Sequence, residues 1–192
     1  MHPRRTSRDV EAIHRRRFLR AGAACSLGVL LPSLATPAAA KLRTEKRREL
    51  SFVNLHTEES LRTVYWADGR YQLDGLEAID RVLRDHRTGE TFPIDVDLLD
   101  LLAQLRRELG TRAPFHVISG YRSLATNHML AAQSDGVAYA SLHVEGKAID
   151  IRVPDRRLKD VRRAALALES GGVGYYPADQ FVHVDVGRVR WW

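Results

Sequence analysis

The sequence predicts one compact α+β domain that begins near residue 50 and extends to residue 192. Of the 192 residues, 44% are hydrophobic and 28% are charged, which are globular proportions and exclude a disordered or fibrous protein. Apolar residues recur at helical spacing in some segments and alternate as in strands in others. No internal repeat, low-complexity segment or linker follows residue 41. About 140 residues are therefore left for a single folded unit.

The excess of positive charge lies at the start of the chain. The 30 Lys and Arg residues outnumber the 24 Asp and Glu residues, giving a net charge of +6. Residues 1–40 hold seven arginines and two acidic residues, which leaves 23 basic and 22 acidic residues for the remainder. Because the basic excess belongs to this leader and not to a surface of the domain, we expect no nucleic-acid partner.

Residues 1–40 resemble a twin-arginine signal peptide. Arg15–Arg20 follows the pattern Arg-Arg-x-Phe-Leu-Lys with arginine in the last place, and residues 21–34 are weakly apolar. This run is shorter than the about 20 apolar residues of a membrane span. Residues 38–40 are three alanines, the small-residue form of a cleavage site. The resemblance implies export by the twin-arginine machinery to the periplasm or cell envelope, with either cleavage after residue 40, leaving no membrane span, or retention as an anchor.

The single cysteine, Cys25, lies inside this leader. The mature part can therefore enter an oxidising compartment with no disulfide to form, and any metal site in it must use histidine and carboxylate ligands. Residues 41–49 are charged and aperiodic, so we expect them to be a solvated lead-in to a domain at 50–192.

The first half of the domain is predicted to contain two strands and two helices. Leu50–His56 and Thr63–Trp66 are β-prone, and the Ala-Asp-Gly sequence that follows is typical of a hairpin turn. Asp95 or Asp97 can cap the second helix, and Gly110 can end it. The apolar residues at helical spacing are Leu76, Ile79, Val82 and Leu83 in the first helix and Leu98, Leu101, Leu102, Leu105 and Leu109 in the second.

The second half adds four strands and two helices. Ser123 can cap a helix of about a dozen residues that ends before Gly136. A second helix is expected after Pro154, with an apolar stripe that stops at Gly171. The predicted strands are Phe115–Ser119, Lys147–Val153, Val173–Tyr176 and Phe181–Val186.

Two segments carry residues suited to metal chemistry. His143 and Asp150 are seven residues apart, and Gly146 between them allows the chain to turn. In Phe181–Gly187, valines alternate with His183 and Asp185, so one face of this strand is apolar and the other presents an imidazole and a carboxylate. A buried strand face does not normally carry both groups unless something binds them.

His143, Asp150 and His183 would leave the fourth position of a tetrahedral zinc ion to water, which is the catalytic pattern. Zinc lowers the pKa of such a water molecule and polarises a bound carbonyl group. The sequence therefore predicts metal-assisted hydrolysis with one Zn²⁺ per chain. The other histidines of the mature part are expected to have structural roles, namely His56, His86, His116 and His128.

The motif at 141–150, Ser-x-His-x-x-Gly-x-Ala-x-Asp, resembles that of the zinc D-Ala-D-Ala metallopeptidases, which share a fold with lysostaphin-like enzymes and the hedgehog signalling domain. The ending at 173–185 is similar to the exported murein endopeptidase branch of that family. The resemblance implies a hedgehog/DD-peptidase-like domain with a mainly antiparallel central sheet and flanking helices. It also implies zinc ligands at His143, Asp150 and His183, and a substrate-binding arginine at Arg122.

By the same resemblance, Ser141 belongs to the substrate-binding site, and the substrates are peptidoglycan stem peptides and their crosslinks. The position of the general base departs from the pattern. Many family members place a Glu three residues before the last zinc histidine, or a His two residues before it, where this chain has Gln180 and Phe181. Asp185 is the nearest titratable group on the correct strand face, so the base is Asp185, a carboxylate from elsewhere, or absent.

Three functions remain open on this basis. The first is a zinc-dependent murein endopeptidase that hydrolyses an amide bond in peptidoglycan crosslinks. The second is a D,D- or L,D-carboxypeptidase that trims stem peptides, which needs the same zinc chemistry and a basic pocket for a terminal carboxylate. The third is a zinc-bearing wall-binding module without turnover, which the missing Glu at position 180 favours.

Overall fold

The computed structural model describes residues 45–133 and 140–192. The predicted signal peptide at 1–40, with Cys25, lies outside these described residues, and so does the predicted helix end before Gly136. Within the described part, none of the helices has the length and apolar character that crossing a bilayer requires.

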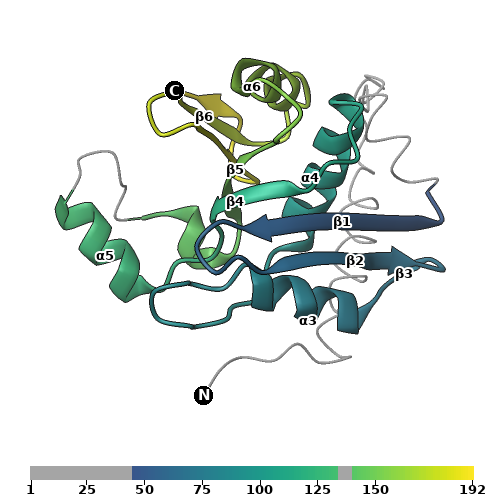
Figure 1. Cartoon of the computed structure of the whole chain (residues 1–192), viewed down its shortest axis with the longest axis horizontal. Coiled ribbons are helices and arrows are strands. Elements are labelled where there is room, and N and C mark those ends of the chain that lie inside the picture. Colours follow the sequence, from purple (N-terminus) through teal and green to yellow (C-terminus); the bar gives the residue numbers. More distant parts are fainter. Residues whose placement is uncertain (1–44, 134–139) are drawn as a thin grey trace, which may run out of the picture.

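The described chain forms one eight-stranded sheet with four α-helices and one short 3₁₀ helix (Figure 1). The strands are β1 (Arg47–Asn54), β2 (Ser60–Ala67), β3 (Arg70–Tyr71), β4 (Phe115–Ser119), β5 (Ala148–Arg152), β6 (Gly172–Tyr176), β7 (Phe181–Asp185) and β8 (Arg190–Trp191). The helices are α3 (Leu73–Val82), α4 (Val96–Glu108), α5 (Leu124–Gln133), η1 (Leu142–Glu145) and α6 (Leu158–Ala167). The strand order is β3-β2-β1-β4-β5-β7-β6-β8, and only β1–β4 and β6–β8 are parallel. The predicted α+β class with a mainly antiparallel sheet is confirmed.

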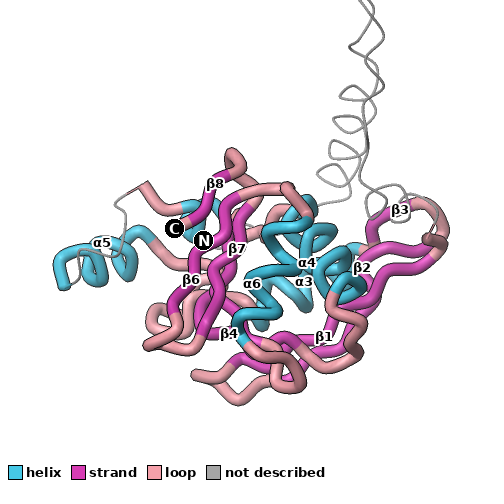
Figure 2. Tube along the Cα trace, turned by 90° about the horizontal axis from the view of Figure 1, so that it is seen from above, coloured by secondary structure: helices cyan, strands magenta, loops and turns pink. Residues whose placement is uncertain are grey.

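The sheet has one covered face and one open face around its C-terminal half. Helices α3, α4 and α6 lie together on one side of the strands, whereas α5 projects on the other side (Figure 2). Buried apolar residues of these three helices and of β1, β4, β5 and β7 form one hydrophobic core. Residues of β5 and β7 that alternate with the core positions therefore point to the open face.

The caps predicted from the sequence are present. The Asp95 carboxylate accepts a hydrogen bond from the Asp97 amide at 2.9 Å, and α4 is followed by Gly110 in the left-handed conformation, with φ of +59°. The Ser123 hydroxyl accepts a hydrogen bond from the Thr126 amide at 3.2 Å at the start of α5. The hairpin turn between β2 and β3 also falls where it was predicted.

The start of the sheet differs from the prediction. Strand β1 begins at Arg47, so the last three residues of the expected lead-in at 41–49 belong to the sheet. Arg48 is 5% exposed, and its Nη1 donates to Asp100 Oδ1 at 2.9 Å. Tyr65 also donates to that oxygen at 2.9 Å, and the Arg48 guanidinium lies 4.6 Å from the ring centroid of Trp66. The charge pattern could not distinguish this buried arginine from its exposed neighbours because its partner lies 52 residues away.

We expect Arg48→Ala to lower the free energy of unfolding by about 3–5 kcal/mol, because it removes the guanidinium that pairs with the buried Asp100 carboxylate. Chemical denaturation measures this change. The control is Arg47→Ala, which removes a side chain that is 66% exposed and should change stability by no more than about 0.5 kcal/mol. Equal, small effects of the two substitutions would contradict a structural role for the buried ion pair.

Candidate metal centre

The register of β5 against β7 brings two predicted ligands together. Asp150 is paired with His183 across the two strands. Their sequence neighbours point into the core, so both side chains project from the open face. Asp150 is 3% exposed and the side chain of His183 is 12% exposed, which places the pair in a shielded position on that face.

The third predicted ligand, His143, comes from the 3₁₀ helix η1, which precedes β5. Ser141 caps this helix, and its hydroxyl accepts a hydrogen bond from the His143 amide at 3.3 Å. Gly146 ends η1 with φ of +65°, and a Cβ atom there would lie 2.4 Å from the Pro93 carbonyl oxygen. The serine and the glycine of the motif therefore shape the turn that carries His143 to the strand.

The three side chains present one ligand atom each to a common centre. Their ligand atoms lie within 4.8 Å of one another. His143 Nε2 is 3.2 Å from His183 Nδ1 and 3.3 Å from Asp150 Oδ1. His183 Nδ1 and Asp150 Oδ1 are 2.9 Å apart. Ligand bonds of about 2.0–2.1 Å in tetrahedral geometry require separations of about 3.3 Å. The donor set and its spacing therefore fit a zinc ion.

Hydrogen bonds hold both imidazoles in the orientation that this centre needs. His143 Nδ1 donates to the Gly120 carbonyl oxygen at 2.7 Å, which leaves Nε2 for the centre. His183 Nε2 donates to Asp185 Oδ2 at 3.0 Å, which leaves Nδ1. Metal-binding histidines in proteins usually donate their second nitrogen to a carbonyl or carboxylate in this way.

The charges of the group are strongly coupled. Burial lowers the pKa of His143. Burial also acts to lower the pKa of His183, but its hydrogen bonds with Asp150 and Asp185 outweigh that effect and raise the pKa. Burial alone would raise the pKa of Asp150, yet the two imidazoles hold it well below its usual range. Protonation of His183, between two carboxylates, is therefore favoured, and a metal ion must compete with it.

The geometry argues against Asp185 as the general base. Asp185 is fully buried, and its oxygens also accept from the amides of Gly172 and Gly187, at 3.0 and 2.8 Å. Arg190 donates through Nη1 to Oδ1 at 3.1 Å and through Nη2 to Oδ2 at 2.7 Å. Although burial alone would raise the pKa of Asp185, the bonds from His183 and Arg190 hold it well below its usual range. These contacts occupy both oxygens of Asp185 and place the carboxylate behind His183, which argues against its accepting a proton from water.

Position 180 also supplies no base. Gln180 lies in the β6–β7 turn, with its side chain exposed and its amide donating to the Pro177 carbonyl oxygen. Among the described residues, Asp150 and Asp185 are the only carboxylates hydrogen-bonded to the two histidines of the centre. Of the three alternatives that the sequence leaves open, these contacts favour a base from elsewhere or no separate base over Asp185.

Arg122, which is predicted to bind substrate, contacts Asp150 of the predicted metal centre. Its Nη2 donates to Asp150 Oδ2 at 2.5 Å, and its Nε donates to the Ser119 hydroxyl at 2.8 Å. Asp150 therefore directs Oδ1 to the centre and Oδ2 to Arg122. These two contacts leave Nη1 of Arg122 without a hydrogen-bond partner among the described residues.

Two further residues of the site were not assigned to it from the sequence. Arg190 holds Asp185 in a two-point contact, and its guanidinium lies 5.0 Å from the ring centroid of Trp192. The Trp192 ring is 5.3 Å from that of His183, and its Nε1 donates to the Tyr176 hydroxyl at 2.7 Å. Aromatic residues near a chain end more often pack against the domain and anchor that end. Only the sheet places this one beside a predicted ligand.

Comparison with known proteins indicates the same peptidase family as the motif at 141–150. A profile of the peptidase M15 family described as "Peptidoglycan L,D-endopeptidase MepK" matches residues 42–192. Peptidoglycan L,D-endopeptidase MepK of Escherichia coli K12 is 43% identical over 180 residues, covering 93% of this chain and 97% of the relative. The probable peptidoglycan L,D-endopeptidase MepK of Haemophilus influenzae is 41% identical over 154 residues, covering 80% and 83%. This chain therefore belongs to the peptidoglycan L,D-endopeptidase MepK family of M15 peptidases.

Proposed function

We propose that this protein is a zinc-dependent murein endopeptidase that hydrolyses an amide bond in the peptide crosslinks of peptidoglycan. The observation that carries the proposal is the His143–Asp150–His183 group, whose spacing fits a tetrahedral metal ion with an open position. Family membership supports the substrate class, because relatives of this chain carry the name peptidoglycan L,D-endopeptidase. A zinc ion held there would supply a water molecule of lowered pKa and would polarise the scissile carbonyl.

The protein groups around the centre have distinct tasks in this proposal. Arg122 keeps Asp150 in position through Nη2 and offers Nη1 to a carbonyl or carboxylate oxygen of the substrate. The buried Asp185 keeps His183 in the required tautomer and orientation. Ser141 supports the turn that carries His143, which is a task distinct from the substrate contact expected of it.

Digestion of purified sacculi by the zinc-loaded protein tests the proposal. Separation of the fragments by mass should show crosslinked dimers converted to monomers. Loss of single terminal residues without loss of dimers would identify a carboxypeptidase instead. Sedimentation with sacculi and no new fragments would identify a wall-binding module. The matched control is His143→Ala, which should release no fragments, so that the sacculi are the same as those incubated without protein.

We also propose export by the twin-arginine route to the periplasm or cell envelope, on the grounds of Arg15–Arg20 and the alanines at 38–40. Changing Arg15 and Arg16 to lysine should leave uncleaved precursor in the cytoplasm. Fractionation of cells followed by detection of the two forms measures this. Normal periplasmic delivery of the double variant would contradict the proposed route, and Arg4→Lys with Arg5→Lys provides a control of equal charge outside the pattern.

A further inference from the structure

We propose that Arg152 and the pocket beside it form a subsite for a carboxylate group of the peptidoglycan stem peptide. This inference rests on the proposed function, since it adds a second point of substrate recognition to the metal centre. The sequence predicts no role for Arg152 and a structural one for His116, which lies next to it.

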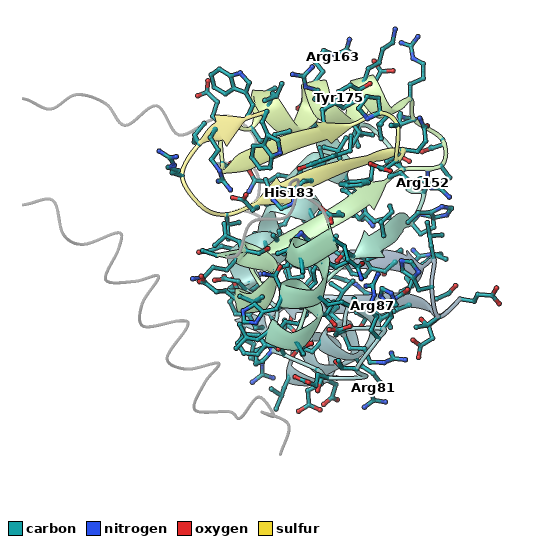
Figure 3. All side chains as sticks on the ribbon, turned by 90° about the vertical axis from the view of Figure 1, so that its left-hand side faces the viewer. Arg81, Arg87, Arg152, Arg163, Tyr175 and His183 are labelled. Carbon is teal, nitrogen blue, oxygen red and sulfur yellow. The ribbon has the colours of Figure 1, made fainter. Side chains whose placement is uncertain are left out.

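The subsite belongs to the same open sheet face as the metal centre. Arg152 follows Asp150 by two residues on β5, so their side chains project from the same face with their Cα atoms about 6–7 Å apart. His116 is the cross-strand partner of Arg152 on β4. In Figure 3, His183 and Arg152 lie at the same height across the sheet, whereas Arg163 of α6 lies above them.

The pocket lies at the end of β5 and has a volume of about 320 Å³. Its polar lining residues are Arg152, His116, Arg156 and Gln180, and its apolar ones are Val153, Pro154 and Leu158. Arg156 is engaged by Asp155 and by the carbonyl oxygens of the α4 end, at 2.9 Å for both Leu109 and Gly110. Arg152 is exposed and has neither a hydrogen bond nor an ion pair with the residues that the structure describes. The pocket therefore holds one uncompensated guanidinium.

The neighbourhood of His116 agrees with an excess of positive charge. Burial, and then the charge of Arg152, lower the pKa of His116, so its imidazole is neutral and can donate or accept a hydrogen bond at neutral pH. A planar guanidinium beside a neutral imidazole is suited to a carboxylate, which it can bind through two parallel hydrogen bonds.

The surface between the metal centre and Arg152 suits an extended peptide. Phe181 precedes His183 by two residues on β7, and its ring stacks on that of Tyr176 with centroids 4.5 Å apart. These rings occupy the open face next to the end of β5, because β5 and β7 are paired. An extended peptide rises about 3.3 Å per residue, so a carboxylate at Arg152 would belong to a residue about two positions from the scissile bond.

Stem peptides offer carboxylates of two kinds, on side chains and at the chain end, and the chemistry of the subsite is the same for both. Three crosslinked stem peptides distinguish the two sources. One has all carboxylates free, one has only its side-chain carboxylates amidated, and one has only its terminal carboxylates amidated. kcat and KM are measured for the zinc-loaded protein, for Arg152→Gln and for Arg152→Lys. Arg163→Gln is the control, because Arg163 is 79% exposed on α6, on the other side of the sheet.

With free carboxylates, Arg152→Gln should raise KM and lower kcat/KM by about 10- to 100-fold with little change in kcat, as expected for one lost charge-assisted contact. Arg152→Lys should recover part of this loss, and Arg163→Gln should match the unaltered protein. Amidation of the carboxylate that binds should abolish the difference between the unaltered protein and Arg152→Gln, which identifies the source. An unchanged KM in Arg152→Gln, or an equal loss on every substrate, would overturn the subsite.

If the unaltered protein cuts none of these peptides, the proposed function fails while the subsite can still be tested. Calorimetric titration of the same peptides then compares the dissociation constants of the unaltered protein and Arg152→Gln. Weaker binding of the free-carboxylate peptide by about 10-fold or more in the variant, with no difference for the matching amidated peptide, would support the subsite. Equal dissociation constants would overturn it.

Discussion

Replacing His143 or His183 by alanine is expected to abolish metal retention and to reduce peptide hydrolysis by about 10³-fold or more. Each substitution leaves two of the three ligand atoms that converge on one centre. A metal ion of this kind contributes several kcal/mol to stabilisation of the transition state, so its loss removes most of the rate. Zinc content after dialysis, followed by hydrolysis of a crosslinked peptide, measures both effects.

The control for these variants is His86→Ala. His86 stacks on His56 with ring centroids 3.8 Å apart and does not belong to the His143–Asp150–His183 group. This variant should retain zinc and activity. Full zinc occupancy in both His143→Ala and His183→Ala would refute the assignment of the ligands.

The same centre predicts the direction of the pH dependence. Ligand imidazoles must be neutral, and metal binding displaces the proton from His183. Because the pKa of His183 is raised above its ordinary value of 6.5, competition by protons begins above pH 6.5 and increases as the pH falls. Zinc affinity measured by competition with a chelator should therefore decrease steadily on acidification. An affinity that does not change between about pH 8 and pH 5.5 would contradict protonation of the ligand group.

Asp185→Asn is expected to weaken zinc binding by about 10- to 100-fold, the usual effect of removing a carboxylate that supports a metal-binding histidine. Both oxygens of Asp185 accept hydrogen bonds, from His183, Arg190, Gly172 and Gly187. In asparagine, an NH₂ group would replace one of these oxygens and would face donors that it cannot pair with. With the amide nitrogen in the place of Oδ1, three contacts are mispaired, from Gly172, Gly187 and Arg190. With the nitrogen in the place of Oδ2, two contacts are mispaired, from His183 and Arg190. The second orientation mispairs fewer donors, and in it His183 loses the bond that directs Nδ1 to the centre.

Titration with zinc distinguishes this positioning role from that of a general base. If Asp185 positions His183, added zinc should restore kcat of Asp185→Asn toward that of the unaltered protein. If Asp185 were the base, the variant would bind zinc normally and kcat would stay about 10²- to 10⁴-fold lower at saturating zinc. Arg190→Gln should weaken zinc binding in the same direction, because Arg190 holds Asp185 at two points. Arg188→Gln, two residues away, is the matched control.

Much of the metal centre could be predicted because its information is local. The spacing of His143 and Asp150, with Gly146 between them, specifies a turn followed by a strand, and the structure contains that turn and strand. The alternation of valines with His183 and Asp185 specifies which side chains share a strand face. The caps at Asp95 and Ser123 were predictable for the same reason, since a cap binds backbone amides within three residues.

The tasks of individual polar groups were decided by contacts between distant segments. Asp185 shares a strand face with His183, which the sequence indicates, but its saturation by Arg190, Gly172 and Gly187 requires three chain segments to meet. For that reason we expect Asp185, which has the spacing of a general base, to position His183 instead. The sequence by itself determined the metal-binding motif, the α+β class and the family. The tertiary structure decided which charges are buried, paired or free, as for Arg48, Arg122 and Arg152, because solvation and pairing depend on neighbours that the chain brings together only on folding.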